Sequence, residues 1–178
     1  GASEAPTLEL MRNSASPATG DDIGTIDFIG EDDGDNATTY AQISAEIADE
    51  TGGTEDGWLR LGASFAGTLQ PNMMTIKGNV PEVVINEGSG DIDFRVESNG
   101  NANMLKVDGG QDNVGIGTAP SSTALLHIQD DGSKDATVRV ESTDTGASSG
   151  PVIEFYRNSA TPTAGDDLGY VNFTGENA

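Results

Sequence analysis

The sequence predicts an all-β, elongated and repetitive chain with little or no helix, which needs neighbouring chains to complete its core. Three observations predict this: apolar and polar residues alternate in short runs, one segment occurs twice, and apolar residues are scarce. Hydrophobic residues make up 34% of the chain and aromatic residues 5%, whereas globular domains carry about 45–50% apolar residues. The large and β-branched residues are regularly spaced, which argues against disorder despite this composition.

Alternation of apolar and polar residues is the signature of strands with one apolar face. It is clearest where Ile92, Phe94 and Val96 alternate with charged residues. The other runs are residues 8–10, 26–28, 43–47, 59–63, 105–107, 114–116, 126–128, 138–140 and 171–173. Segments rich in Gly, Asn and Asp separate the runs and predict tight turns. Residues 42–50 are ambiguous, because their Ala and Glu residues favour helix while the isoleucines keep the strand period.

An internal repeat is the most informative feature of the sequence. Residues 6–33 align without gaps with residues 151–178, at an offset of 145 residues, and 14 of 28 positions are identical. Several substitutions keep the apolar character, such as Leu10 to Phe155 and Ile26 to Val171. The second copy stops where the first continues, so we expect the natural polypeptide to be longer. A shorter echo relates residues 94–98 to residues 138–142.

The charge of the chain limits its partners. It carries 30 Asp and Glu against 8 Lys and Arg, a net charge of −22. Such a surface repels phosphates, so we expect no nucleic acid partner and no membrane insertion. The chain has no cysteine, which excludes disulfides and thiolate metal ligands. We expect the protein to work in a salty medium, where counterions screen repulsion between chains.

Part of the sequence resembles the shaft of phage tail fibres and related virion proteins. Residues 93–98, 103–108, 113–118 and 125–128 follow a family pattern in which F-x-V, ML-x-V-D, VGIGT and LLHI recur, often upstream of a self-cleaving chaperone domain. The repeated segment is similar to fibre proteins of marine phages and prophages. The resemblance implies a homotrimeric fibre shaft of three parallel chains, an intertwined triple β-helix or a β-prism-like structure. It implies a structural component of the virion that supports host attachment.

The resemblance also implies partners and a domain organisation. The chain would associate with itself, with other virion proteins and, through regions outside this segment, with a host receptor. Residues 1–50 would form a first shaft repeat with its continuation, and residues 51–90 a connecting β segment. Residues 91–145 would form the VGIGT and LLHI shaft segment, and residues 146–178 the start of a second, truncated copy.

Two alternatives use the same stacking of strands. The first is a bacterial cell-surface adhesin or extracellular filament, which would be located on the cell and not on a virion. The second, less favoured, is a polysaccharide-binding or depolymerising module carried by the fibre. No GxSxG, HExxH or P-loop pattern occurs, so we predict no catalytic residues and no enzymatic activity.

Two acidic loops are candidate calcium sites, and calcium is the only cofactor considered. One loop contains Asp32, Asp33 and Asp35, and the other contains Asp108 and Asp112. Their carboxylates are the oxygen donors that Ca²⁺ prefers. Neither loop has the order of an EF-hand, so a solvated acidic turn is the simpler interpretation.

Two further side chains are candidates for binding. Trp58, next to a predicted strand start, is a candidate platform for stacking a carbohydrate ring, although packing at the rim of a sheet is the simpler interpretation. His127 lies between Leu126 and Ile128, so alternation places it on the opposite face, towards solvent. A lone histidine in a chain without cysteine cannot form a single-chain zinc site.

Overall fold

The computed structural model describes residues 5–130, 138–143, 146, 150–167, 169, 171–173 and 175. The chain divides into two compact units, residues 1–135 and 136–178. The strands lie in the first unit, in two sheets. The described part of the chain has no helix, and hence none long and apolar enough to cross a membrane. The predicted all-β class is confirmed.

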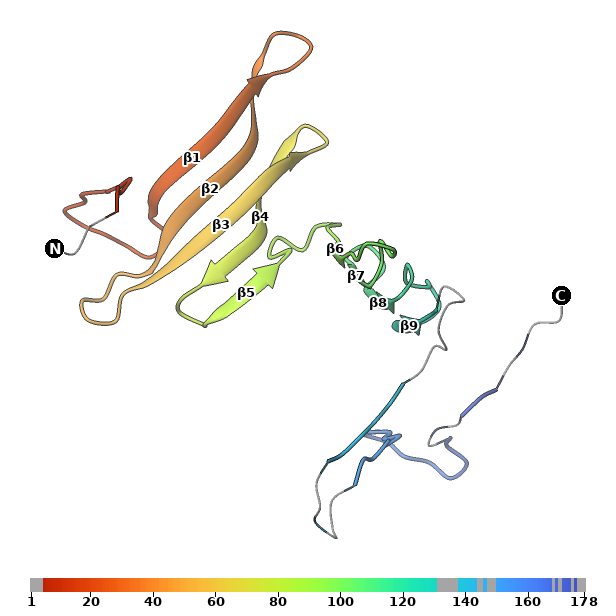
Figure 1. Cartoon of the computed structure of the whole chain (residues 1–178). Coiled ribbons are helices and arrows are strands. Elements are labelled where there is room, and N and C mark those ends of the chain that lie inside the picture. Colours follow the sequence, from red (N-terminus) through yellow and green to blue (C-terminus); the bar gives the residue numbers. More distant parts are fainter. Residues whose placement is uncertain are drawn as a thin grey trace. The chain divides into compact units, whose positions relative to one another are not determined.

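Five antiparallel strands form the larger sheet in sequence order, so that each strand lies beside the next (Figure 1). They are β1 (Asp22–Glu31), β2 (Ala37–Asp49), β3 (Asp56–Phe65), β4 (Thr68–Lys77) and β5 (Glu82–Ile85). Ala66 and Gly67 connect β3 to β4 with φ of 49° and 78°, the backbone that suits a two-residue hairpin. The stretch that was ambiguous between helix and strand lies almost entirely in β2, because both neighbouring strands pair with it.

Four short strands form the smaller sheet. They are β6 (Phe94–Val96), β7 (Leu105–Asp108), β8 (Asn113–Ile116) and β9 (Leu126–Ile128). The strand order follows the sequence, and the first three strands are antiparallel. The chain then crosses over, so that β9 pairs with β8 in parallel. This sheet contains the segment that resembles fibre shafts.

The glycines of the VGIGT motif are required by close backbone approach. A Cβ at Gly115 would collide with the carbonyl oxygen of Thr118. A Cβ at Gly117, where φ is 79°, would collide with the carbonyl oxygen of Gln129. Only glycine combines this φ with the missing side chain. The motif therefore encodes the crossover that returns the chain to β9.

Several predicted strand positions were wrong. Residues 8–10, 138–140 and 171–173 alternate but lie in no strand, because alternation favours an extended chain whereas a strand also needs a hydrogen-bonded neighbour. Ile92 precedes β6. Strands β4 and β5 were missed. In β4 a register irregularity opposite Gly62 disrupts the alternation, and β5 is only four residues long.

Both copies of the repeated segment adopt the same local structure. In the first copy, Arg12 Nη1 donates to the carbonyl oxygen of Asp22 at 3.0 Å, and its Nη2 lies 3.1 Å from the Asp21 carboxylate. Arg157 makes the same two contacts in the second copy, at 2.8 and 3.2 Å. The glycine before the aspartate pair has a positive φ in both copies, 87° and 93°. The sequence repeat is therefore a repeat of structure.

An apolar contact is also repeated. A Cβ at Gly24 would lie 3.0 Å from the Leu10 Cβ atom, and a Cβ at Gly169 would lie 3.2 Å from the Phe155 Cβ atom. Leucine in one copy and phenylalanine in the other therefore pack against the same glycine position. The apolar residue and the glycine are required together.

Arg12→Ala is expected to loosen residues 13–21 without unfolding the sheet. Because the Arg12 side chain is 40% exposed, its ion pair contributes at most about 1 kcal/mol. We expect faster hydrogen exchange at the Asp21 amide, which donates to the Ala18 carbonyl oxygen at 3.0 Å. Arg157→Ala is the matched variant for the second copy. Unchanged exchange at Asp21 would show that the arginine does not hold the loop.

Candidate functional site

Each sheet has one apolar and one polar face, because paired residues on neighbouring strands point to the same side. In the larger sheet the register aligns two apolar rows, which we call the apolar face. The rows are Ile26, Ile43, Leu61, Met74 and Ile85, and Gly24, Ala45, Leu59, Ile76 and Val83. The opposite side, which we call the polar face, carries Thr25, Ser44, Arg60, Thr75 and Val84, and Glu46, Trp58, Lys77 and Glu82.

The apolar face is uncovered in the single chain. Val83 is 58% exposed, Ile76 39% and Leu59 38%. No hydrophobic side chain in the described part of the chain is buried, whereas Ser44 and Thr75 on the polar face are. Globular domains have the opposite distribution, with apolar residues inside. The single chain therefore has apolar surface that only a partner can cover.

The smaller sheet repeats this arrangement. Its apolar face comprises Phe94, Val96, Leu105, Val107, Val114, Ile116, Leu126 and Ile128, and Leu126 is 55% exposed. His127 lies on the opposite face, as predicted, in register with Gly115. It is half-buried and does not point freely into solvent, because its Nδ1 atom is enclosed. The exposure predicted for His127 was therefore wrong.

Trp58, the candidate carbohydrate platform, lies on the polar face among charged side chains. The Arg60 guanidinium and the Lys77 ammonium lie 5.1 and 5.2 Å from its ring centroid. The indole N–H donates to Asn79 Oδ1 at 2.7 Å, and Arg60 pairs with Glu46 at 2.6 Å. These cation–π contacts stabilise the ring in place. A stacking sugar would compete with the two cations, and carbohydrate binding stays a prediction.

The first candidate calcium loop is a turn held by its own carboxylate. Asp32 Oδ1 accepts hydrogen bonds from the amides of Gly34 and Asn36 at 2.8 and 2.9 Å. These bonds, those from Asn36 first, hold the pKa of Asp32 below its usual value. Asp33 and Asp35 are exposed. The geometry explains the acidic turn without a metal, and calcium binding here stays a prediction.

The second candidate loop is closed in the same way. Asp108, at the end of β7, accepts hydrogen bonds from the amides of Gly110 and Gln111 at 3.1 and 3.0 Å. Asp112 is exposed and has a positive φ of 55°, which aspartate tolerates better than most residues. Asp108 therefore stabilises the β7–β8 turn.

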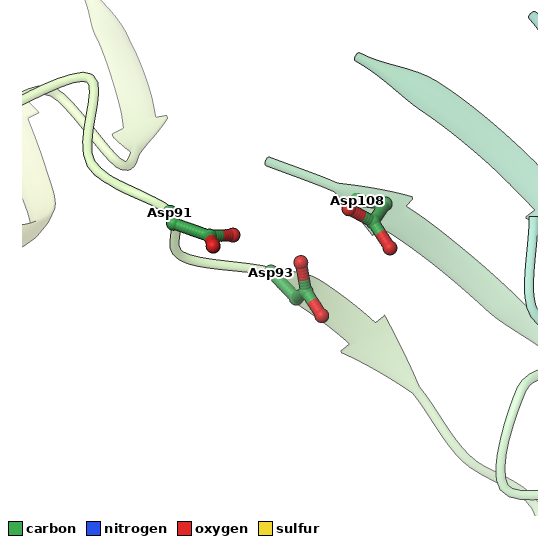
Figure 2. A group of neighbouring side chains, drawn as sticks. All are labelled: Asp91, Asp93 and Asp108. Atoms are coloured by element: carbon green, nitrogen blue, oxygen red, sulfur yellow. The ribbon is translucent and has the colours of Figure 1, made fainter. Parts of the chain in front are cut away.

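A cluster of three carboxylates includes two residues that the sequence did not indicate. Figure 2 shows Asp91 and Asp93 on the segment that enters β6 and Asp108 at the end of β7, with ligand oxygens within 4.8 Å of one another. The Lys106 ammonium lies 2.9 Å from Asp93 and 2.9 Å from Asp108. A divalent cation would compete with this ammonium. The cluster forms because β6 pairs with β7, a tertiary fact with no local sequence signal.

Asp108→Asn is expected to weaken the acid sensitivity of the protein. The Lys106 ammonium holds the pKa of Asp108 below its ordinary value of 3.8. A carboxylate with a lowered folded pKa contributes stability above its unfolded pKa, and this stability is lost as pH falls through the folded pKa. Between about pH 5 and pH 2 the urea midpoint should therefore fall less in Asp108→Asn than in the wild type. Asp35→Asn, in another loop, should retain the wild-type fall, and equal falls in all three proteins would contradict the prediction.

The faces, loops and cluster together indicate a surface for association more than a site for chemistry. No protein-family model matches the chain, and no curated protein matches it. The surface that the structure offers for function is the apolar face, which is continuous across five strands.

Proposed function

We propose that this chain is a structural segment of a phage virion appendage, a tail-fibre shaft that supports host attachment. Three parallel copies form the shaft, and a receptor-binding part of the fibre lies outside this segment. The observation that carries the proposal is the uncovered apolar face on each of the two sheets, with no hydrophobic side chain buried in the described residues. A chain of this kind becomes stable by burying those faces between copies, because hydrophobic burial is the main favourable term in folding and association.

The internal repeat supports a filament. The same arginine clamp and the same glycine contact occur 145 residues apart. Repetition of one unit along a chain is the design of quasi-one-dimensional proteins, in which each unit packs against its neighbours. The virion assignment itself comes from the resemblance of residues 93–128 to fibre shafts, and a bacterial surface filament is the alternative with the same physics.

Light scattering coupled to size-exclusion chromatography tests the architecture. We expect about three times the 18.3-kDa chain mass, and small-angle scattering should give the profile of a rod. A folded monomer would overturn the proposal. Immunogold labelling then separates the two origins, since a shaft labels the appendages of phage particles whereas a surface filament labels cells.

Assembly is expected to depend on salt. Each chain carries a net charge of −22, so association brings like charges together. The Debye length falls from about 30 Å at 0.01 M to about 8 Å at physiological ionic strength. We therefore expect the assembly to dissociate at higher protein concentration in 10 mM than in 500 mM NaCl (both rough choices of low and high screening). Equal masses across a dilution series in the two buffers would contradict this expectation.

A further inference from the structure

We infer that the apolar face of the larger sheet is the surface on which two further copies of this chain dock, so that three such faces enclose one core. The inference rests on the proposed trimeric shaft and assigns its contact surface. It distinguishes this face from the polar face and from the sheet edges at β1 and β5, each of which is another route to association.

Charge favours this face over the opposite one. Its two rows contain no charged residue, although the chain as a whole carries −22. Burying the polar face would instead desolvate the Arg60–Glu46 pair and the Lys77 ammonium, which lies 3.5 Å from Glu82. Removing such charges from water is costly. Docking through the apolar face leaves the acidic surface in solvent.

The size of the face suits a stable interface. Strands about 4.8 Å apart that rise about 3.3 Å per residue give five paired strands a face of roughly 500 Å². Monomeric proteins rarely expose an apolar patch larger than a few hundred Å² without a function for it. A standard interface buries about 800 Å² on each partner, and the apolar face of the smaller sheet supplies further area of the same kind.

The repeat favours copies of the same chain over a foreign partner. Leu10 packs against Gly24, and Phe155 packs against Gly169 at the equivalent place in the second copy. Apolar residues at equivalent positions are also uncovered, since Phe28 is 53% exposed and Phe173 is 92% exposed. Parallel copies in register meet the same pattern at both positions. A different protein would have to carry apolar patches with the same 145-residue spacing.

Thiol accessibility in the assembled full-length chain tests the inference. The chain has no cysteine, so a single introduced thiol reports only its own site. Leu59→Cys places a thiol on the apolar face, at a position 38% exposed in the single chain. Thr25→Cys is the control, because Thr25 is exposed on the polar face. At the trimer mass, we expect Leu59→Cys to react with a thiol reagent roughly tenfold more slowly or less, since thiol reactivity requires access.

The outcomes separate the inference from the proposed function. A trimer in which the two thiols react equally fast would overturn the assigned face and leave the trimeric shaft standing. A monomer in light scattering would overturn both. If Leu59→Cys fails to assemble, Val83→Cys on strand β5 replaces it, because Val83 is 58% exposed in the single chain and tolerates a small side chain at the edge. Protection at Val83 supports the inference, and full reactivity there overturns it.

Discussion

Leu61→Glu is expected to convert the assembled protein into monomers. Leu61 lies in the middle of the central apolar row, between Ile43 on β2 and Met74 on β4. In a trimer closed through the apolar face, the substitution would bury three carboxylates close together without a cation. An unpaired buried charge costs roughly 3–5 kcal/mol, and each 1.4 kcal/mol is about a tenfold loss of affinity. Light scattering at micromolar concentration should therefore show the mass of one chain.

Thr25→Glu is the matched control for the added charge. Thr25 is exposed on the polar face, in the row that contains Arg60. Its variant should keep the wild-type mass, because the new carboxylate stays in solvent. If Leu61→Glu also retains the wild-type mass, the copies do not meet through the apolar face. If both variants dissociate, added charge alone explains the loss.

Gly117→Ala is expected to give the largest loss of stability among single methyl additions outside the apolar face. An alanine there must adopt a φ of 79° and place its Cβ against the carbonyl oxygen of Gln129. The left-handed conformation costs about 1–2 kcal/mol, and forcing a group into an occupied space costs about 1–3 kcal/mol more. The Gln129 amide also donates to the Ile116 carbonyl oxygen at 3.0 Å, so the collision weakens the contact of β9 with β8.

Gly67→Ala separates the two causes. Gly67 has nearly the same φ, 78°, but a Cβ there meets nothing within 4 Å. It should lose only the conformational part, about 1–2 kcal/mol. Urea unfolding of both variants, at one protein concentration because assembly contributes to stability, measures the difference. Equal losses would show that the crossover relaxes around the new methyl group.

One-sided sheets explain how the proposed function would follow from the fold. A sheet with a polar and an apolar face is incomplete alone and complete when identical faces meet, so folding and assembly become one process. The polar face remains available to solvent, with its ion pairs already formed. Such a chain is suited to transmit force or hold distance, since it has no need of a cleft.

Much of the architecture could be predicted from the sequence because it depends on local patterns. Period-two alternation identified the segments that contain β1, β2, β3 and β6 to β9, and it assigned their apolar sides. The repeat predicted that residues 6–33 and 151–178 share a structure, and the two arginine clamps agree with this. The acidic loops were recognised as turns, since aspartate hydrogen-bonds to the backbone two or three residues ahead.

Other features depended on tertiary structure, because they join residues that the sequence does not relate. Strand β4 is held by its partners on both sides although its alternation is broken. The Asp91, Asp93 and Asp108 cluster exists only because β6 pairs with β7 and Lys106 lies between two of its carboxylates. Residues 171–173 alternate as β1 does, yet form no strand.

The sequence by itself determined which residues are extended, which side of each strand is apolar and where the chain turns. Only the tertiary structure decided which strands pair, that β9 runs parallel to β8, and that the paired rows join into a continuous uncovered face. The physical reason is that alternation and turn chemistry act within a few residues. Hydrogen-bonded register, by contrast, is chosen by the whole sheet, where each strand completes the hydrogen bonds of its neighbours.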